Sequence, residues 1–279
     1  MHILTFDIED WFYLFHKTDG RALEKWDLPS PNLERNTDRI CQFLEEKNLK
    51  ASFFWLGSEA KRYPELVRKI NALGHEIGVH SFYHIKVNEL SENVFRENTS
   101  KAIETLEDIS GKKVKAYRAP GLSMNEKTLW AFETLIDLGI EMDSSLLTGQ
   151  FVDNKRIPNQ PFIADFNGLK IREFPISSFP FLNHSFNYGG SGYFRISPYK
   201  FLQKRITKSP YIMSYFHPRD FDLNIHRKIS GNPYLKLKYR IGAENAFQKL
   251  EKLSEKVNWI SLEKASGQMN WCDAKIVRL

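Results

Sequence analysis

Two histidines four residues apart, His80 and His84, carry the most informative chemical signal in the chain. An imidazole nitrogen is a good ligand for a borderline divalent metal such as zinc. If the chain turns helically after His80, both rings lie on one face. Such a pair also arises by chance as one core and one surface histidine, so its meaning depends on what the fold brings beside it.

Three acidic residues near the start of the chain are candidates to lie beside the two histidines: Asp7, Glu9 and Asp10. Asp7 ends a short apolar segment, where a carboxylate needs a partner or a metal because burying it alone is costly. Arg118 is a natural partner, either as a structural salt bridge or as the group that orients a catalytic base. A carboxylate from Asp10 or Glu9 would complete a ligand set of two histidines and one carboxylate. Acidic residues at a strand end also cap helices or bind solvent.

His217 is the candidate proton donor. The apolar segment 211–216 predicts a strand that Pro218 ends at once, so His217 would lie at a strand end. A side-chain pKa near neutrality suits general acid catalysis. A single histidine is more often structural, and its position relative to the other candidates decides between the two interpretations.

The elements that must position these residues alternate regularly. Apolar segments at 2–7, 51–57, 75–80, 114–118 and 140–147 predict strands, and periodic segments at 36–47, 63–73, 93–109 and 127–138 predict helices. Alternation with short connections is typical of parallel β/α units. In a parallel β/α barrel the carboxyl ends of all strands meet on one face, where active sites form. The candidate residues follow those ends.

The regular alternation of strands and helices is interrupted in the second half of the chain. Residues 151–210 are rich in Pro, Phe, Gly and Asn and predict an irregular, hairpin-rich insertion. Within it, Gly189 to Gly192 predict a loop that needs positive φ. A strand at 211–217, a helix at 243–256 and a strand at 259–262 complete the pattern. No composition break divides the chain, so we expect one domain over residues 1–279.

Composition narrows the function classes. The 279 residues include 42% hydrophobic ones, enough for a substantial core, and 40 basic against 34 acidic residues give a charge of +6. This mild, dispersed excess favours an ordinary solvated surface over nucleic-acid binding, and leaves peripheral association with a membrane or glycolipid open. Cys41 and Cys272 show no metal or disulfide spacing. No basic leader or long apolar segment is present near the start, so we expect a cytoplasmic protein.

The ordered motifs resemble those of a known family. Thr5-Phe-Asp7 with Asp10, His80-Ser-Phe-Tyr-His84, Arg118-Ala-Pro120 and His217 are similar to the motif set of the polysaccharide deacetylases, carbohydrate esterase family four. Further segments resemble a subgroup whose first motif reads Asp-x-Glu-Asp-Trp and which is associated with exopolysaccharide and O-antigen-type glycan synthesis. These segments are 6–12, 172–175, 189–195 and 216–222.

The resemblance implies a fold, a cofactor and residue roles. The family fold is a distorted (β/α)7–8 barrel, and its metal is a divalent ion, usually zinc. By position, Asp7 matches the general base, His80 and His84 match the metal ligands, and His217 matches the general acid. Arg118 matches the residue that orients the base.

The motif leaves two candidates for the third metal ligand, Asp10 and Glu9, because Ile8 and Glu9 separate Asp7 from Asp10. Strand alternation places Asp7 and Glu9 on one side, so Glu9 is the ligand if the strand continues. If the chain turns at Ile8, Asp10 takes that place. We favour Asp10, because the Thr-Phe-Asp match then keeps Asp7 as the base.

The function expected from these residues is metal-dependent removal of an N-acetyl group from an amino sugar of a surface glycan or its precursor. One alternative is a deformylase or cyclic amidohydrolase on the same scaffold. Another is a catalytically inactive glycan-binding protein, although sugar binding alone would not require Asp7, His80, His84 and His217 together.

Overall fold

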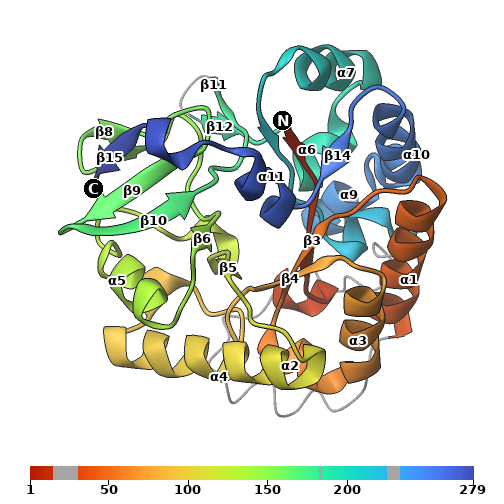
Figure 1. Ribbon diagram of the computed structural model, residues 1–279. Helices are drawn as coiled ribbons and strands as arrows, with labels where there is room; N and C mark the ends of the chain where they lie inside the picture. The colour runs from red at the N-terminus through yellow and green to blue at the C-terminus, as the bar shows by residue number, and fades with distance from the viewer. Residues whose placement is uncertain (15–30, 182–183, 225–232) are drawn as a thin grey trace.

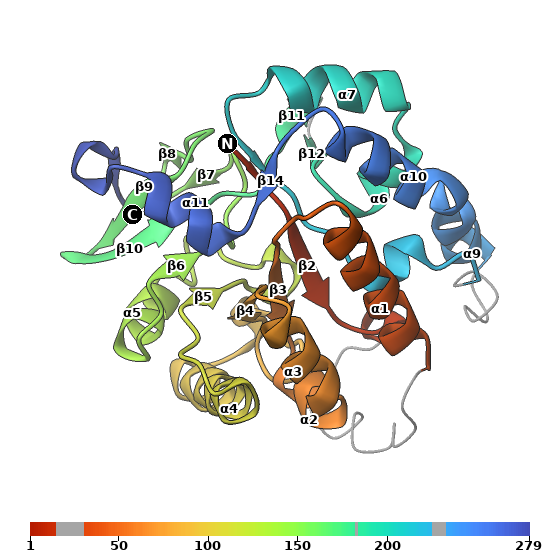
Figure 2. The ribbon, with the colours of Figure 1, turned by 45° about the vertical axis from the view of Figure 1, so that its right-hand side comes forward.

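Strands of the chain curve round a common interior, with helices on the outside (Figure 1). The computed structural model describes residues 1–14, 31–181, 184–224 and 233–279. Figure 2 shows α1, α2, α3 and α4 beside one another along the part of the wall formed by the first strands. The predicted α/β class and barrel-like architecture are therefore confirmed.

Parallel strands form most of the barrel wall. Neighbouring strands follow the chain order β2 (Thr5–Ile8), β3 (Ser52–Trp55), β4 (Glu76–Val79), β5 (Ala116–Tyr117), β6 (Met142–Asp143) and β10 (Leu169–Glu173). On the other side, β1 (His2–Ile3) pairs in parallel with β13 (Ile212–Met213) and β14 (Trp259–Ile260). Beyond β10, the amide of Ser177 donates to the carbonyl oxygen of Met213 at 3.3 Å. This contact closes the gap between the two sheets.

Most helices of the first half lie where the periodicity predicts them, but the helix over residues 57–62 falls in no predicted helix. They are α1 (Pro31–Glu46), α2 (Gly57–Arg62), α3 (Pro64–Ala72), α4 (Glu92–Ser110) and α5 (Trp130–Asp137), with short 3-10 turns η1 (Trp11–Leu14), η3 (Val87–Glu89) and η4 (Pro120–Leu122). Helix α4 shows why the ends fall where they do. The Ser91 hydroxyl accepts from the Val94 amide at its start, and Gly111, with φ of 68°, ends it in the left-handed conformation.

Segment 151–210 contains the expected hairpins but is more regular than predicted. The hairpins are β7 (Phe151–Val152) with β8 (Lys155–Arg156), β9 (Phe162–Phe166) with β10, and β11 (Phe179–Phe181) with β12 (His184–Phe186). Strand β10 also belongs to the barrel wall, and β15 (Ile276–Arg278) pairs with β9. Helices α6 (Ser191–Ile196) and α7 (Tyr199–Lys208) occupy the rest. Leu202 and Ile206 are buried one helical turn apart in α7, a short signal that the prediction overlooked.

The remaining elements are η5 (Pro218–Phe221), α9 (Pro233–Arg240), α10 (Ala243–Ser254), α11 (Leu262–Gln268) and η6 (Trp271–Asp273). Among the described residues no helix combines the length and apolarity required to cross a bilayer.

Alternation along the strands sorts the core into two layers. In β3, Phe53 and Trp55 face the helices, whereas Phe54 packs inside the barrel with Ile3 and Met142. The interior towards the carboxyl ends of the strands is polar, with three fully buried charged side chains: Arg118, Asp143 and Glu173. The barrel interior is therefore apolar around Phe54 and becomes polar towards the carboxyl ends of the strands.

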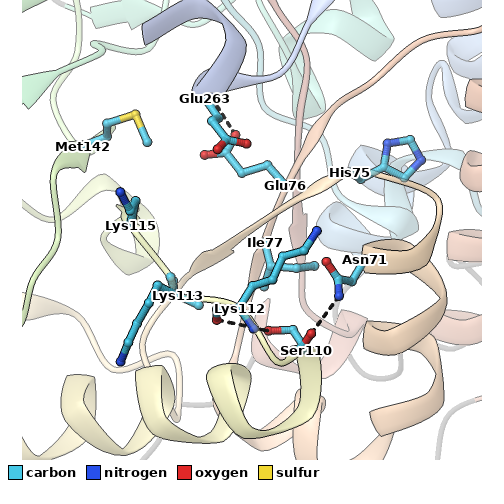
Figure 3. A pocket seen from close by; sticks show the side chains of 11 residues that line it. Asn71, His75, Glu76, Ile77, Ser110, Lys112, Lys113, Lys115, Met142 and Glu263 are labelled. Atoms are coloured by element: carbon cyan, nitrogen blue, oxygen red, sulfur yellow. Dashed lines mark hydrogen bonds between the residues drawn. The ribbon is translucent and has the colours of Figure 1, made fainter. Parts of the chain in front are cut away.

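The opposite end of the barrel has a hollow of its own, at the amino ends of β4 and β5 (Figure 3). It measures about 80 Å³ and is lined by several charged residues, including Lys112, Lys115 and Glu263. Lys115 pairs with Glu141 at 2.7 Å, and the Glu263 amide donates to Glu76 Oε2 at 2.9 Å. These contacts hold the first turn of α11 against the amino end of β4 and join the segments that enter β5 and β6, which is a structural role.

Candidate active site

Asp7 and Arg118 form a buried pair at the centre of the barrel mouth. Asp7 lies in the last half of β2, and Arg118 follows β5 directly. Arg118 Nη1 donates to Asp7 Oδ1 at 2.7 Å and to Thr5 Oγ1 at 2.7 Å, while Nε and Nη2 donate to the carbonyl and hydroxyl oxygens of Ser144. The guanidinium therefore holds one carboxylate oxygen of Asp7 and leaves Oδ2 directed towards other groups.

His80, at the carboxyl end of β4, has a fixed tautomeric environment. Its Nδ1 lies 2.7 Å from the carbonyl oxygen of Arg118, which can only accept, so Nδ1 carries the proton and Nε2 presents a lone pair. Burial lowers the pKa of His80 to about 4, although Asp7 opposes the shift. A neutral imidazole with a free Nε2 is the form that binds a metal.

The segment from His80 to His84 does not form the helical turn that would place both rings on one face. Ser81 and His84 have φ values of 71° and 60°, and the amide of His84 donates to Ser81 Oγ at 3.0 Å. This tight turn brings the two imidazole rings to a centroid distance of 5.3 Å. A left-handed turn, rather than a helical one, therefore brings the two imidazoles together.

Glu9 completes a three-residue group with the two histidines. Among the described residues, Glu9, His80 and His84 form a cluster whose potential ligand atoms all lie within 4.8 Å of one another. Glu9 Oε2 is 2.6 Å from His84 Nε2. Glu9 Oε1 is 2.6 Å from Arg219 Nη2. Burial alone would raise the pKa of Glu9, but the charge of Arg219 and the contact with His84 hold it well below its usual value.

The chemistry of this donor set fits a divalent metal. Two imidazoles and one charged carboxylate, with further positions open, are the ligands of catalytic zinc sites. The close approach of Glu9 Oε2 to His84 Nε2 also requires a proton or a cation between them, because a carboxylate oxygen and a ring nitrogen without its proton both present lone pairs. The residues therefore suit the metal that the sequence predicts.

Asp10, the carboxylate that the sequence analysis favoured, lies elsewhere. Its side chain is buried and lines a small cavity that Glu9 also lines, but Asp10 is not part of the group that Glu9 forms with the two histidines. Strand β2 ends at Ile8, where the amide of Glu9 donates to the carbonyl oxygen of Asp7 at 3.1 Å, and Glu9 lies with the two imidazoles beyond this tight turn. In this structure, the carboxylate that lies with the two imidazoles is that of Glu9, the other candidate that the sequence leaves open.

His217 lies on the opposite side of the same centre. Its Nε2 is 3.9 Å from Asp7 Oδ2 and 3.1 Å from Glu9 Oε1, and its Nδ1 is 3.0 Å from Asp220 Oδ2. Burial and Arg219 lower the pKa of His217, but Asp220 and Glu9 outweigh them and raise it above the usual value. His217 therefore keeps its proton to a higher pH than a free imidazole, and its Nε2 is the ring nitrogen near Asp7 and Glu9.

Three residues of this centre were not singled out from the sequence: Asp220, Arg219 and Arg195. Asp220 also accepts from the amide of His217 at 2.9 Å, which locks the loop of η5. Arg195 Nε lies 3.4 Å from Asp220 Oδ1, and burial of Asp220 is outweighed by His217 and Arg195, which lower its pKa. The available signal was their presence in segments 189–195 and 216–222, which resemble subgroup motifs.

The glycines before α6 explain how Arg195 reaches this position. A Cβ on Gly190 would lie 1.6 Å from the carbonyl oxygen of Tyr215, so only glycine allows the chain to pack against the end of β13. Gly190 is fully extended, with φ of −177°. The expectation that this loop needs positive φ at its glycines is wrong, because close packing rather than handedness requires them. Ser191, with φ of 49°, makes the left-handed turn.

Fold and site together define a parallel β/α barrel whose mouth holds the Asp7 carboxylate and the His217 imidazole beside two histidines and a glutamate that could hold a metal. Residues 3–140 match the family model described as polysaccharide deacetylase, and residues 145–266 match a domain of unknown function, DUF3473. Residues 3–140, just under half of the chain, are therefore similar to the polysaccharide deacetylase family. His217, Arg219, Asp220 and Arg195 all come from the second matched segment.

Known proteins are similar to the chain in sequence or in fold. A peptidoglycan-N-acetylglucosamine deacetylase of Bacillus cereus is 35% identical over 104 residues, which is 37% of this chain and 38% of that relative. The chain thus spans well under half of that relative's length.

Two solved structures share the fold. A Mycobacterium smegmatis protein provisionally classed as a polysaccharide deacetylase has a TM-score of 0.69 at 20% identity, covering 99% of this chain and 92% of the other. A Bacillus anthracis protein described as a CE4 family pseudoenzyme has a TM-score of 0.51 at 14% identity, covering 99% of this chain and 66% of the other. The fold alone therefore does not establish catalysis, and the site residues must carry that argument.

Proposed function

We propose that the chain hydrolyses the acetamide of an N-acetylated amino sugar in a glycan or glycan precursor, with a divalent metal held by Glu9, His80 and His84. One observation carries the proposal. Asp7 Oδ2 and His217 Nε2 lie 3.9 Å apart, beside the ligand set, and an amide placed there would contact a proton acceptor and a proton donor together.

Each residue then has a defined task. Asp7, fixed through Oδ1 by Arg118, accepts the proton of the attacking water through Oδ2. His217 donates from Nε2 to the departing amine nitrogen, while Asp220 holds its ring and stabilises its charge. When bound, the metal supplies Lewis acidity that polarises the acetamide carbonyl and acidifies water. The C–N bond breaks as the amine takes its proton, releasing acetate and a free amino sugar.

The finer details are also part of the proposal. Zinc is the expected metal, because the donor set combines two imidazoles with one carboxylate. A surface glycan such as an exopolysaccharide or O-antigen, or its precursor, is the expected substrate. The sequence resemblance to the corresponding subgroup and the deacetylase activity named for the Bacillus cereus relative support this substrate class.

Acetate release tests the proposal directly. The purified protein is incubated with a panel of N-acetylated sugars and oligosaccharides, alone, with chelator, and with chelator followed by zinc. We expect acetate from at least one amino-sugar substrate, loss with chelator and recovery with zinc. Formate release or ring opening of a cyclic amide would instead favour a different amide hydrolase. Glycan binding without any released acid would leave an inactive binding protein.

A further inference from the structure

The positive charge of the chain is concentrated in one segment. Between Glu173 and Glu244 the sequence contains 11 lysines and arginines but only two acidic residues, Asp220 and Asp222. The rest of the chain contains 29 basic and 32 acidic residues, so this segment accounts for the whole net charge of +6. The basic excess is therefore not dispersed along the chain, contrary to the expectation from composition. Such an asymmetry indicates an anionic partner for the segment that carries it.

The two acidic residues of this segment leave its surface charge uncompensated. Asp220 and Asp222 are 1% and 4% exposed, and Asp220 pairs with the buried Arg195. In contrast, Lys236 and Arg240 of α9 are exposed. Over the part of the chain that the structure describes, neither has an acidic side chain as a partner. Helix α9 contains no acidic residue, and Figure 2 shows it at the outer edge of the molecule, on the same side as α10.

Three apolar side chains are exposed beside these charges. Ile196 of α6, Leu237 of α9 and Ile241 are 52%, 56% and 46% exposed, and all three line one hollow of about 500 Å³. The Ile241 amide donates to the Leu237 carbonyl oxygen at 3.0 Å, so these two lie one helical turn apart. Each directly follows a basic residue, Lys236 or Arg240. Single exposed apolar side chains are common, but a cluster around one hollow marks an interaction surface.

Helix α9 is fastened to α6, so this arrangement is fixed before any partner binds. Arg195 Nη1 donates to the carbonyl oxygen of Tyr239 at 2.9 Å. Gly242, with φ of 74°, ends α9 against α6, and a Cβ at this position would lie 2.1 Å from the carbonyl oxygen of Arg195. Only glycine allows this approach. The five residues Ile196, Lys236, Leu237, Arg240 and Ile241 therefore form a preformed surface, called here the α6–α9 surface.

We propose that the α6–α9 surface docks on an anionic lipid bilayer. The three aliphatic side chains enter the headgroup region, while Lys236 and Arg240 pair with lipid phosphates. A nucleic acid would use the two charges but leave the aliphatic side chains in water, and a purely apolar protein partner would leave the charges unpaired. An anionic bilayer satisfies both parts of the surface. The inference does not depend on the proposed deacetylation.

Vesicle sedimentation tests the proposal on the full chain. The protein is mixed with vesicles of phosphatidylcholine alone or with phosphatidylglycerol added, at low and high salt. We expect binding to the anionic vesicles that weakens as salt rises, because salt screens the charges. The double change Lys236→Gln and Arg240→Gln should weaken this binding about 10- to 30-fold. Leu237→Ser should weaken it about 5- to 10-fold, because less apolar surface is buried.

Matched controls lie outside the surface. The double change Lys112→Gln and Lys170→Gln alters the net charge by the same amount at two exposed lysines outside the basic segment. Phe151→Ala removes an apolar side chain that is 65% exposed in β7 and does not line the hollow. Both controls should bind anionic vesicles as the wild type does. Circular dichroism verifies folding, and Ile241→Ser replaces Leu237→Ser if that variant is poorly folded.

Several results would overturn the docking assignment. A wild-type protein that does not bind anionic vesicles would do so, as would equal losses in the basic double variant and its lysine control. Binding to duplex DNA without vesicle binding would indicate a nucleic-acid partner instead. Undiminished vesicle binding by both folded serine variants, Leu237→Ser and Ile241→Ser, would exclude insertion of the apolar side chains.

Docking and hydrolysis fail separately. Acetate release from soluble N-acetylated oligosaccharides, measured on the same preparations, should not change in the variants of the α6–α9 surface. Vesicle binding without acetate release by the wild-type protein would support docking and contradict deacetylation. Acetate release without vesicle binding would support deacetylation and reject docking.

Discussion

Oδ2 of Asp220 lies 3.0 Å from Nδ1 of His217 and also accepts the His217 amide at 2.9 Å. One carboxylate oxygen thus fixes both the backbone and the ring of the proposed general acid. Arg195 lies 3.4 Å from the other oxygen, so the segment before α7 controls the geometry of a residue more than twenty positions away.

Replacing Asp220 by Asn should shift the pH dependence of catalysis. Asp220 raises the pKa of His217, so removing its charge lowers that pKa, and the protonated donor is lost at a lower pH. The alkaline limb of the kcat profile should move to lower pH, and kcat at neutral pH should fall about 10- to 100-fold. Asp137→Asn, a change at an exposed carboxylate on α5, serves as the control. An alkaline limb that stays in place would contradict the role of Asp220.

Metal content should distinguish Glu9 from Asp10. Glu9 lies with both imidazoles, so Glu9→Gln and His80→Ala should each lose stoichiometric metal. Asp10→Asn should retain it, because Asp10 lies outside the cluster among the described residues. Elemental analysis after dialysis, with circular dichroism to verify folding, measures the outcome. Full metal content in Glu9→Gln together with loss of metal from Asp10→Asn would instead identify Asp10 as the ligand.

His217→Ala should separate chemistry from metal binding. His217 is not in the ligand cluster, so the variant should bind metal as the wild type does. Loss of the proton donor should reduce kcat about 10²–10⁴-fold. Metal analysis and acetate release on the same preparation make the comparison. Loss of metal from a folded His217→Ala protein would assign His217 to the ligand set.

Gly190 and Gly267 offer a matched pair of substitutions. Gly190→Ala would place a Cβ 1.6 Å from the Tyr215 carbonyl, so β13 and α6 must separate; we expect a loss of about 2–4 kcal/mol in unfolding free energy. Gly267→Ala lies in α11 with open space around it and should stabilise by about 0.5–1 kcal/mol. Denaturant unfolding measures both. Equal stability of the two variants would show that the close packing at Gly190 is not required.

His75 should make stability depend on pH. Burial lowers its pKa to about 4, from 6.5 in the unfolded chain, so the native state binds fewer protons between these values. The stabilising contribution is present above pH 6.5 and is lost as the pH falls towards 4. His75 Nδ1 lies 3.4 Å from the Ala51 amide, an acceptor role that a glutamine oxygen can take. Between pH 7 and 5, the wild type should lose about 1–2 kcal/mol more than His75→Gln in urea unfolding. Equal losses of unfolding free energy in the wild type and in His75→Gln between pH 7 and 5 would show that His75 does not cause this pH dependence.

Most of the fold is determined by local sequence pattern. Helix α3 buries Leu66, Val67 and Ile70, the same residues whose spacing predicts it, because helical periodicity and burial coincide on a surface helix. The strand segments that precede Asp7, His80 and Arg118 are recognisable because both of their faces are buried. These features place the candidate residues at one end of the barrel without any knowledge of the tertiary contacts. Helix α7 was missed because its two buried residues form too short a pattern.

The partners within the site were decided by tertiary structure alone. The choice between Glu9 and Asp10 depends on the course of the chain after Ile8, and local sequence permits more than one. Arg219 contacts Glu9 across 210 positions of sequence, and no periodicity encodes such a pairing. The sequence therefore supplies the chemical groups and the strand ends that carry them. Only packing of the second half against the first selects which carboxylate faces the histidines and which charges surround it.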